Sequence, residues 1–116
     1  ETYNLLSYGG LRSDRDLVQV DPALSYGIFE YTRIIALMEA GKWSRSQLVP
    51  HAGHLLAYHA VAGLQLGAHE IAARPDFLLG GLHDGVEIAD GEGTLPQSSG
   101  IGFETHGKLW EVLKTV

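Results

Sequence analysis

Two short apolar runs, each ended by a proline and followed by a helical pattern, constrain the fold more than any other feature. The first run, 17–20, leads into Asp21-Pro22, and the second run, 48–50, ends on Pro50. Both runs are typical of short strands. Proline forces the residue before it into an extended conformation, so Asp21 should stand at the carboxyl end of its strand. Strand, helix, strand and helix in this order predict parallel βαβ units.

Helices are expected on either side of these runs. Apolar residues at helical spacing predict a helix over 28–40. Small side chains favour a second helix over 54–66, closed by Gly67. Residues 2–8 should be the last turns of a helix that ends in glycine.

The chain changes character after residue 70, where Gly, Pro and Asp become frequent. Residues 86–88 alternate and predict an edge strand with a turn at Asp90-Gly91. Residues 107–115 predict a short amphipathic helix.

Composition excludes several classes of protein. The chain has no cysteine, which rules out a disulfide scaffold, an iron–sulfur site and thiol catalysis and fits a cytoplasmic protein. A net charge of −6 disfavours nonspecific binding to nucleic acid or to an anionic membrane surface. No uncharged apolar run approaches the roughly 18 residues of a transmembrane helix.

Asp21 and His51 each follow a predicted strand, and ligands bind outside the carboxyl ends of parallel strands. If the strands are neighbours, Asp21 reaches one ring nitrogen of His51, and the other nitrogen is free to move a proton. Alternatively, Asp21 caps the next helix and His51 is a loop histidine. Glu70 follows the second helix and either points back over the strand ends or is a solvated loop residue.

The other histidines give weaker evidence of a functional site. His51, His54 and His59 suggest zinc, but the acidic partner of helical zinc motifs is absent, so no metal site is predicted within the chain. His69, His83 and His106 are expected to be surface loop histidines.

The ordered set of motifs resembles the enolase superfamily. It comprises Asp21 after Val-Gln-Val, SYG at 25–27, LVPHAGH at 48–54, GLQLGAHE at 63–70 and GGLHDGVEIADGEGTLPQSSGIGFE at 80–104. Asp, His and Glu are separated by 30 and 19 residues. Within the superfamily the set is most similar to the mandelate racemase subgroup, and there to acid-sugar and tartrate dehydratases. Ser99 departs from the pattern, because the subgroup usually has proline there.

The resemblance implies roles for single residues. Asp21 would orient His51, and His51 would be the general acid that protonates the departing β-hydroxyl. Glu70 would be an electrophile beside the substrate carboxylate, and we expect both Glu70 and His54 to contact the hydroxy acid substrate. A lysine elsewhere would remove the α-proton, and Mg²⁺ would stabilise the enediolate.

The resemblance also implies an α/β fold that is the C-terminal part of a modified TIM (β/α)7β barrel. Residues 1–70 would form the last strands and helices of the barrel, and 71–116 a tail packed on the barrel and capping domain. Such a barrel needs about 250 residues, so the Mg²⁺ ligands and the lysine are expected upstream of Glu1. The expected partner is the remainder of the same enzyme, in a homo-oligomer. A racemase or epimerase, or a noncatalytic binding domain, remains the alternative.

Overall fold

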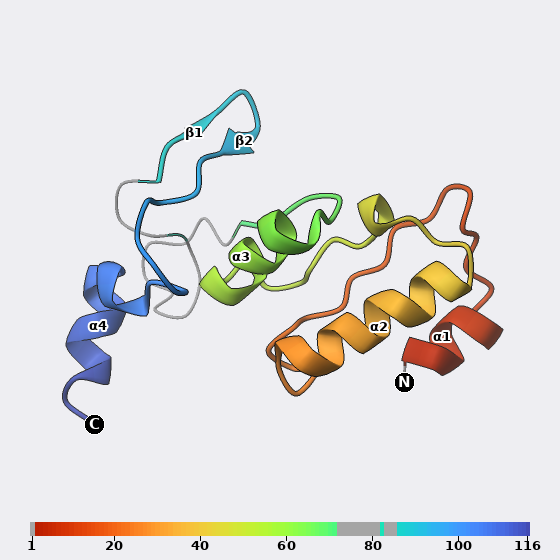
Figure 1. Cartoon of the computed structure of the whole chain (residues 1–116), viewed down its shortest axis with the longest axis horizontal. Helices are drawn as coiled ribbons and strands as arrows, with labels where there is room; N and C mark the ends of the chain where they lie inside the picture. Colours follow the sequence, from red (N-terminus) through yellow and green to blue (C-terminus); the bar gives the residue numbers. More distant parts are fainter. Residues whose placement is uncertain (1, 72–81, 83–85) are drawn as a thin grey trace.

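The computed structural model describes residues 2–71, 82 and 86–116. Its first half contains α1 (Thr2–Tyr8), α2 (Ile28–Ala40), a 3₁₀ turn η1 (Arg45–Gln47) and α3 (Leu55–Leu64). Its second half contains β1 (Ile88–Ala89), β2 (Glu92–Gly93), the 3₁₀ turn η2 (Phe103–Thr105) and α4 (Gly107–Leu113). In Figure 1, α1 and α2 lie side by side, α3 occupies the middle, and the hairpin and α4 lie at the other end.

Local sequence signals place the helices correctly. The helix predicted over 28–40 is α2, with the same bounds, and the one predicted over 2–8 is α1. The terminal helix α4 ends two residues earlier than predicted, and α3 begins one residue later and ends two residues earlier. In α2 the apolar periodicity predicts the packed face, since Tyr31, Ile35 and Met38 are buried at helical spacing.

The two predicted strands are reduced to one parallel bridge between Val18 and Leu48. The Val18 amide donates to the carbonyl of Gln47 at 2.8 Å, and the Val49 amide donates to the carbonyl of Val18 at 3.0 Å. The prediction of parallel neighbours therefore holds, whereas that of full strands does not. Within the described residues no further strand lies beside the pair to extend the hydrogen-bonded ladder.

A different residue from the one predicted ends α3. Gln65 takes the left-handed conformation at the end of the helix, with φ of 57°. Gly67 instead crosses close to η1, where its amide donates to the Leu48 carbonyl at 3.0 Å. A Cβ at Gly67 would collide with the Ser46 carbonyl oxygen. Glycine is needed at position 67 for this close approach, not for ending α3.

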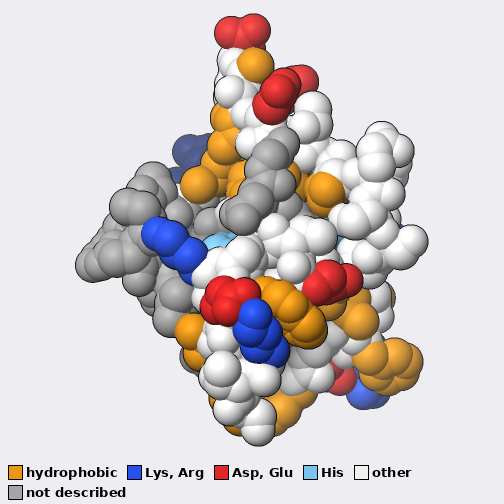
Figure 2. Space-filling view, turned by 90° about the vertical axis from the view of Figure 1, so that its left-hand side faces the viewer, with side chains coloured by type: hydrophobic (Ala, Val, Ile, Leu, Met, Phe, Trp, Pro, Cys, Tyr) orange, Lys and Arg blue, Asp and Glu red, His pale blue; other side chains and the backbone are white. Residues whose placement is uncertain are grey.

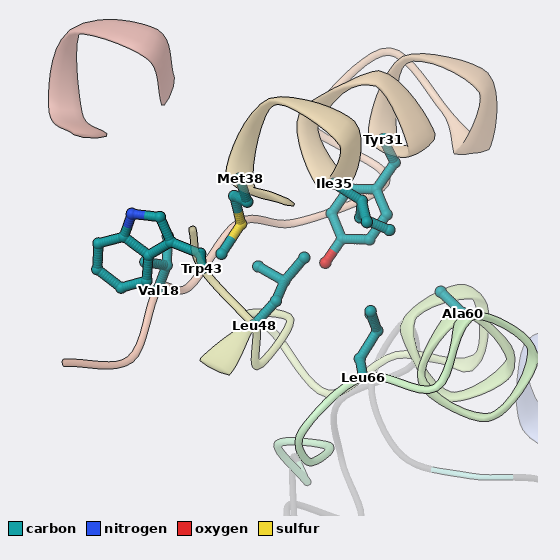
Figure 3. Packing of buried hydrophobic residues seen from close by; sticks show 8 residues of the cluster. All are labelled: Val18, Tyr31, Ile35, Met38, Trp43, Leu48, Ala60 and Leu66. Carbon is teal, nitrogen blue, oxygen red and sulfur yellow. The ribbon is translucent and has the colours of Figure 1, made fainter. Parts of the chain in front are cut away.

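The core lies between α2, the parallel bridge and α3. Tyr31, Ile35 and Met38 point from one face of α2 toward Leu48, as Figure 3 shows. The buried cluster contains Val18, Tyr31, Ile35, Met38, Trp43, Leu48, Ala60 and Leu66. Burial of this apolar surface holds the bridge against both helices, and it thereby fixes where Asp21 and the chain after Pro50 emerge.

The predicted hairpin is present in the second half. Its strands pair antiparallel, with Ile88 opposite Gly93, and Asp90 and Gly91 form the turn with φ of 51° and 81°. Two positive φ angles in a two-residue loop match the twist of a hairpin. The hairpin protrudes in Figures 1 and 2, and acidic side chains lie on it, consistent with the exposed Glu87, Asp90 and Glu92.

Candidate functional site

The parallel bridge sets the position of the candidate site. Asp21 lies three residues beyond Val18, and His51 lies three residues beyond its partner Leu48. Because the two segments run in the same direction, both residues emerge at the same end of the pair, level with each other. The carboxyl ends of parallel strands are where ligand sites form in α/β folds.

Asp21 is the buried carboxylate at this end, with 8% of its surface exposed. Its Oδ1 atom accepts hydrogen bonds from the amides of Ala23 at 2.6 Å and Leu24 at 3.3 Å. The same oxygen accepts a hydrogen bond from Nε2 of His54 at 3.0 Å. Asp21 therefore caps the turn that follows its strand and also joins the two strand ends.

The protonation state of Asp21 follows from these contacts. Burial alone would raise the pKa of the carboxyl group, but the hydrogen bonds from His54, Ala23 and Leu24 outweigh it. The pKa of Asp21 is therefore held below its ordinary value, because each donor favours the charged form. At neutral pH the site contains a carboxylate.

His54 holds this arrangement with both nitrogens of its ring. It is the N-cap of α3, where Nδ1 accepts the amide hydrogen of Ala57 at 3.1 Å. An Nδ1 that accepts carries no proton, so the neutral ring bears its proton on Nε2 and donates it to Asp21. His54 cannot exchange a proton without losing one of these bonds. Its expected contact with a substrate stays a prediction.

The hydrogen bond of Asp21 thus goes to His54, not to His51 as the sequence predicted. His51 is exposed and makes no hydrogen bond or ion pair with any residue that the structure describes. Ala52 and Gly53, with φ of 77° and 60°, turn the chain after His51. This turn and the capping of α3 bring the second histidine of the segment to Asp21 and leave the first at the surface.

Glu70 lies at the same turn. Its Oε2 atom accepts the amide hydrogen of Ala52 at 2.7 Å, although the residue is exposed overall. The structure therefore gathers Asp21, Glu70 and the turn 51–54 at one end of the parallel pair. Glu70 is thus an exposed loop residue, as one of the two predictions had it, and its carboxylate also reaches back to the turn that follows the second apolar run.

Sequence reasoning missed two features of the site. A histidine N-cap is outside the usual set of Ser, Thr, Asp and Asn, so the pattern gave no reason to assign His54 that role. His69 was predicted to be a surface loop histidine. It does lie in a loop, but it is half-buried, and its two ring nitrogens are buried with no hydrogen-bond partner among the described residues. His83 lies outside the described residues.

No group of three His, Asp or Glu side chains converges to hold a metal ion in the part of the chain that the structure describes. Among the same residues, no helix is both long and apolar enough to cross a membrane. No model of a known protein family matches the chain.

Proposed function

We propose that this chain is the C-terminal catalytic segment of a Mg²⁺-dependent acid-sugar dehydratase with a (β/α)7β barrel. The observation that supports it is the gathering of Asp21, the turn 51–54 and Glu70 at the carboxyl ends of two parallel segments. These are the residue types and the place that acid–base chemistry on a hydroxy carboxylate requires. A tartrate-like substrate is the preferred one.

His51 is the proposed general acid. Asp21 uses Oδ1 for its three hydrogen bonds, and Oδ2 accepts none from the described residues. Oδ2 is therefore the atom available to hold one ring nitrogen of His51, while the other nitrogen gives its proton to the departing β-hydroxyl. The C–O bond breaks, water leaves, and the resulting enol becomes a keto acid. The α-proton is taken by a base outside this chain.

Glu70 is the proposed contact for the substrate carboxylate. The amide of Ala52 holds Oε2, which leaves Oε1 to face a ligand. In the electrophile's role, a hydrogen would be shared between Oε1 and the substrate carboxylate.

The described residues do not fit Mg²⁺ by themselves, since no three of their side chains converge on a metal site. The ligands and the base are accordingly proposed to belong to the remainder of the enzyme. Exposed apolar side chains support such a partner, among them Leu17 at 62%, Leu24 at 79% and Phe29 at 76% exposure. A parallel pair with an open edge is also normally covered by further strands.

A noncatalytic remnant of the same barrel is the second candidate. It is favoured by the bond between Oδ1 of Asp21 and His54, a histidine that cannot exchange its proton without losing one of its two hydrogen bonds. In that case Asp21, His54 and Glu70 would serve only to hold the strand ends together.

The test uses the full-length enzyme with Mg²⁺ and tartrate stereoisomers or longer acid sugars in D₂O. Formation of a keto acid is expected. His51→Asn should lower kcat by about 100-fold or more, as expected for loss of a general acid. His59→Asn, the same substitution within α3, is the matched control and should change kcat by less than about two-fold, because a residue outside the acid–base chemistry makes no contribution to it.

Three outcomes would contradict the proposal. Absence of keto acid with every acid sugar excludes the dehydratase. Deuterium in recovered substrate without keto acid indicates a racemase or epimerase. Normal turnover of His51→Asn removes His51 from the chemistry and favours the noncatalytic remnant or another acid.

A further inference from the structure

A line of contacts connects the β1–β2 hairpin to Glu70. Tyr58 of α3 donates its hydroxyl hydrogen to the backbone carbonyl of Thr94 at 2.7 Å, just after β2. A Cβ on Gly93 would lie 2.8 Å from the same hydroxyl oxygen, so the hairpin backbone packs too closely on Tyr58 for a side chain at position 93. The end of the hairpin is therefore fixed on the tip of one α3 side chain.

The other side of Tyr58 contacts His69. Their ring centroids are 5.1 Å apart with the planes tilted by 54°, a separation at which aromatic rings attract each other. Both nitrogens of the His69 ring are buried, and within the part of the chain that the structure describes neither has a hydrogen-bond partner. Burial lowers the pKa of His69 to about 4. The ring is therefore neutral near pH 7, and among the described residues packing alone holds it.

His69 is bonded directly to Glu70 in the chain, and Glu70 binds the Ala52 amide beside His51. An exposed carboxylate has many accessible rotamers, and holding it in one of them is costly in entropy. Anchoring the preceding residue removes much of that freedom, because the backbone from which Glu70 projects is then fixed.

We propose that Tyr58 and His69 are positioning residues that set Glu70 against the turn 51–54. The hairpin holds Tyr58, Tyr58 holds the ring of His69, and His69 fixes the backbone from which Glu70 reaches the Ala52 amide. The importance of Glu70 to turnover rests on the proposed function, whereas the contact path itself does not. The tail of the chain thereby controls the geometry of the site.

Hydrogen exchange at the Ala52 amide tests the path in the full-length enzyme, because this amide is the one that Glu70 protects. Tyr58→Phe removes the hydroxyl bond to Thr94 and should speed Ala52 exchange about five-fold. His69→Ala removes the ring and should speed it about ten-fold, whereas His69→Phe keeps a ring in the same place and should restore most of the protection.

The matched control is Tyr26→Phe, which removes a hydroxyl from a side chain that is 96% exposed and should leave Ala52 exchange unchanged. Amides within α3 are the second control. A general loss of stability would speed the exchange of the α3 amides together with that of Ala52. Loss of the Glu70 contact alone would speed only the exchange of Ala52. In an active enzyme kcat/KM should fall about ten-fold in His69→Ala and recover in His69→Phe, as misplacement of a substrate contact predicts.

Unchanged Ala52 exchange in both Tyr58→Phe and His69→Ala would overturn the proposal, and so would a parallel rise in the α3 amides. If His69→Ala does not fold, Tyr58→Phe and His69→Phe decide by the same readout. Absence of turnover in the wild-type enzyme would refute the proposed function. The exchange result would still test the contact path from the hairpin to Glu70.

Discussion

Replacing Asp21 and His54 by alanine, singly and together, measures the bond that joins the two strand ends. The side chains are 8% and 15% exposed, and Nε2 of His54 lies 3.0 Å from Oδ1 of Asp21. A hydrogen bond to a charged group at such a site contributes about 1.5–3 kcal/mol. We therefore expect a coupling energy of about 2 kcal/mol between the two residues.

Each single variant loses a further contact. Asp21→Ala also leaves the amides of Ala23 and Leu24 without their acceptor, and His54→Ala leaves the Ala57 amide uncapped. A lost cap costs about 1 kcal/mol. Each variant should therefore lose about 3 kcal/mol, and the double variant about 4 kcal/mol, not the 6 kcal/mol of independent residues.

The assay is urea unfolding of the full-length protein, with free energies of unfolding extrapolated to water. A second cycle pairs Asp21→Ala with His51→Ala. Because His51 is exposed and makes no described hydrogen bond, these two changes should add within about 0.5 kcal/mol. Additivity in the His54 cycle together with coupling in the His51 cycle would refute the Asp21–His54 pair and support the Asp21–His51 pair predicted from sequence.

Two other predictions concern pH and close packing. The pKa of Asp21 is lower in the folded chain than in the unfolded chain, so its ionisation stabilises the fold above the ordinary carboxyl pKa of about 4. The stability difference between wild type and Asp21→Asn should thus shrink as the pH falls from about 5 through the folded-state pKa, and a widening difference in acid urea titrations would contradict the assignment. Gly67→Ala should cost about 1–3 kcal/mol, because its Cβ meets the Ser46 carbonyl. Gly63→Ala, in open space on α3, is the control and should stabilise by about 0.5–1 kcal/mol, so equal melting temperatures for the two variants would count against the close approach.

The local elements could be predicted from sequence because their signals are local. The apolar face of α2 repeats with helical spacing over 28–40, and the hairpin turn needs only the left-handed preference of Asp90-Gly91. Parallel pairing was also predictable, since a helix between two apolar runs returns the chain in the same direction. The end of α3 was not, because Gln65 has no strong preference for the left-handed conformation that it takes.

For the candidate site, the sequence by itself determined that Asp21 and two histidines stand near strand ends, because proline and apolar runs fix where those ends are. It left open whether Glu70 reaches them. Which histidine meets Asp21 was decided only by tertiary structure. His51 and His54 are three residues apart and chemically identical, so composition and spacing cannot separate them. The turn at Ala52-Gly53 and the capping of α3 orient one ring toward the buried carboxylate and the other toward solvent, and these orientations exist only once the two strand ends have packed together.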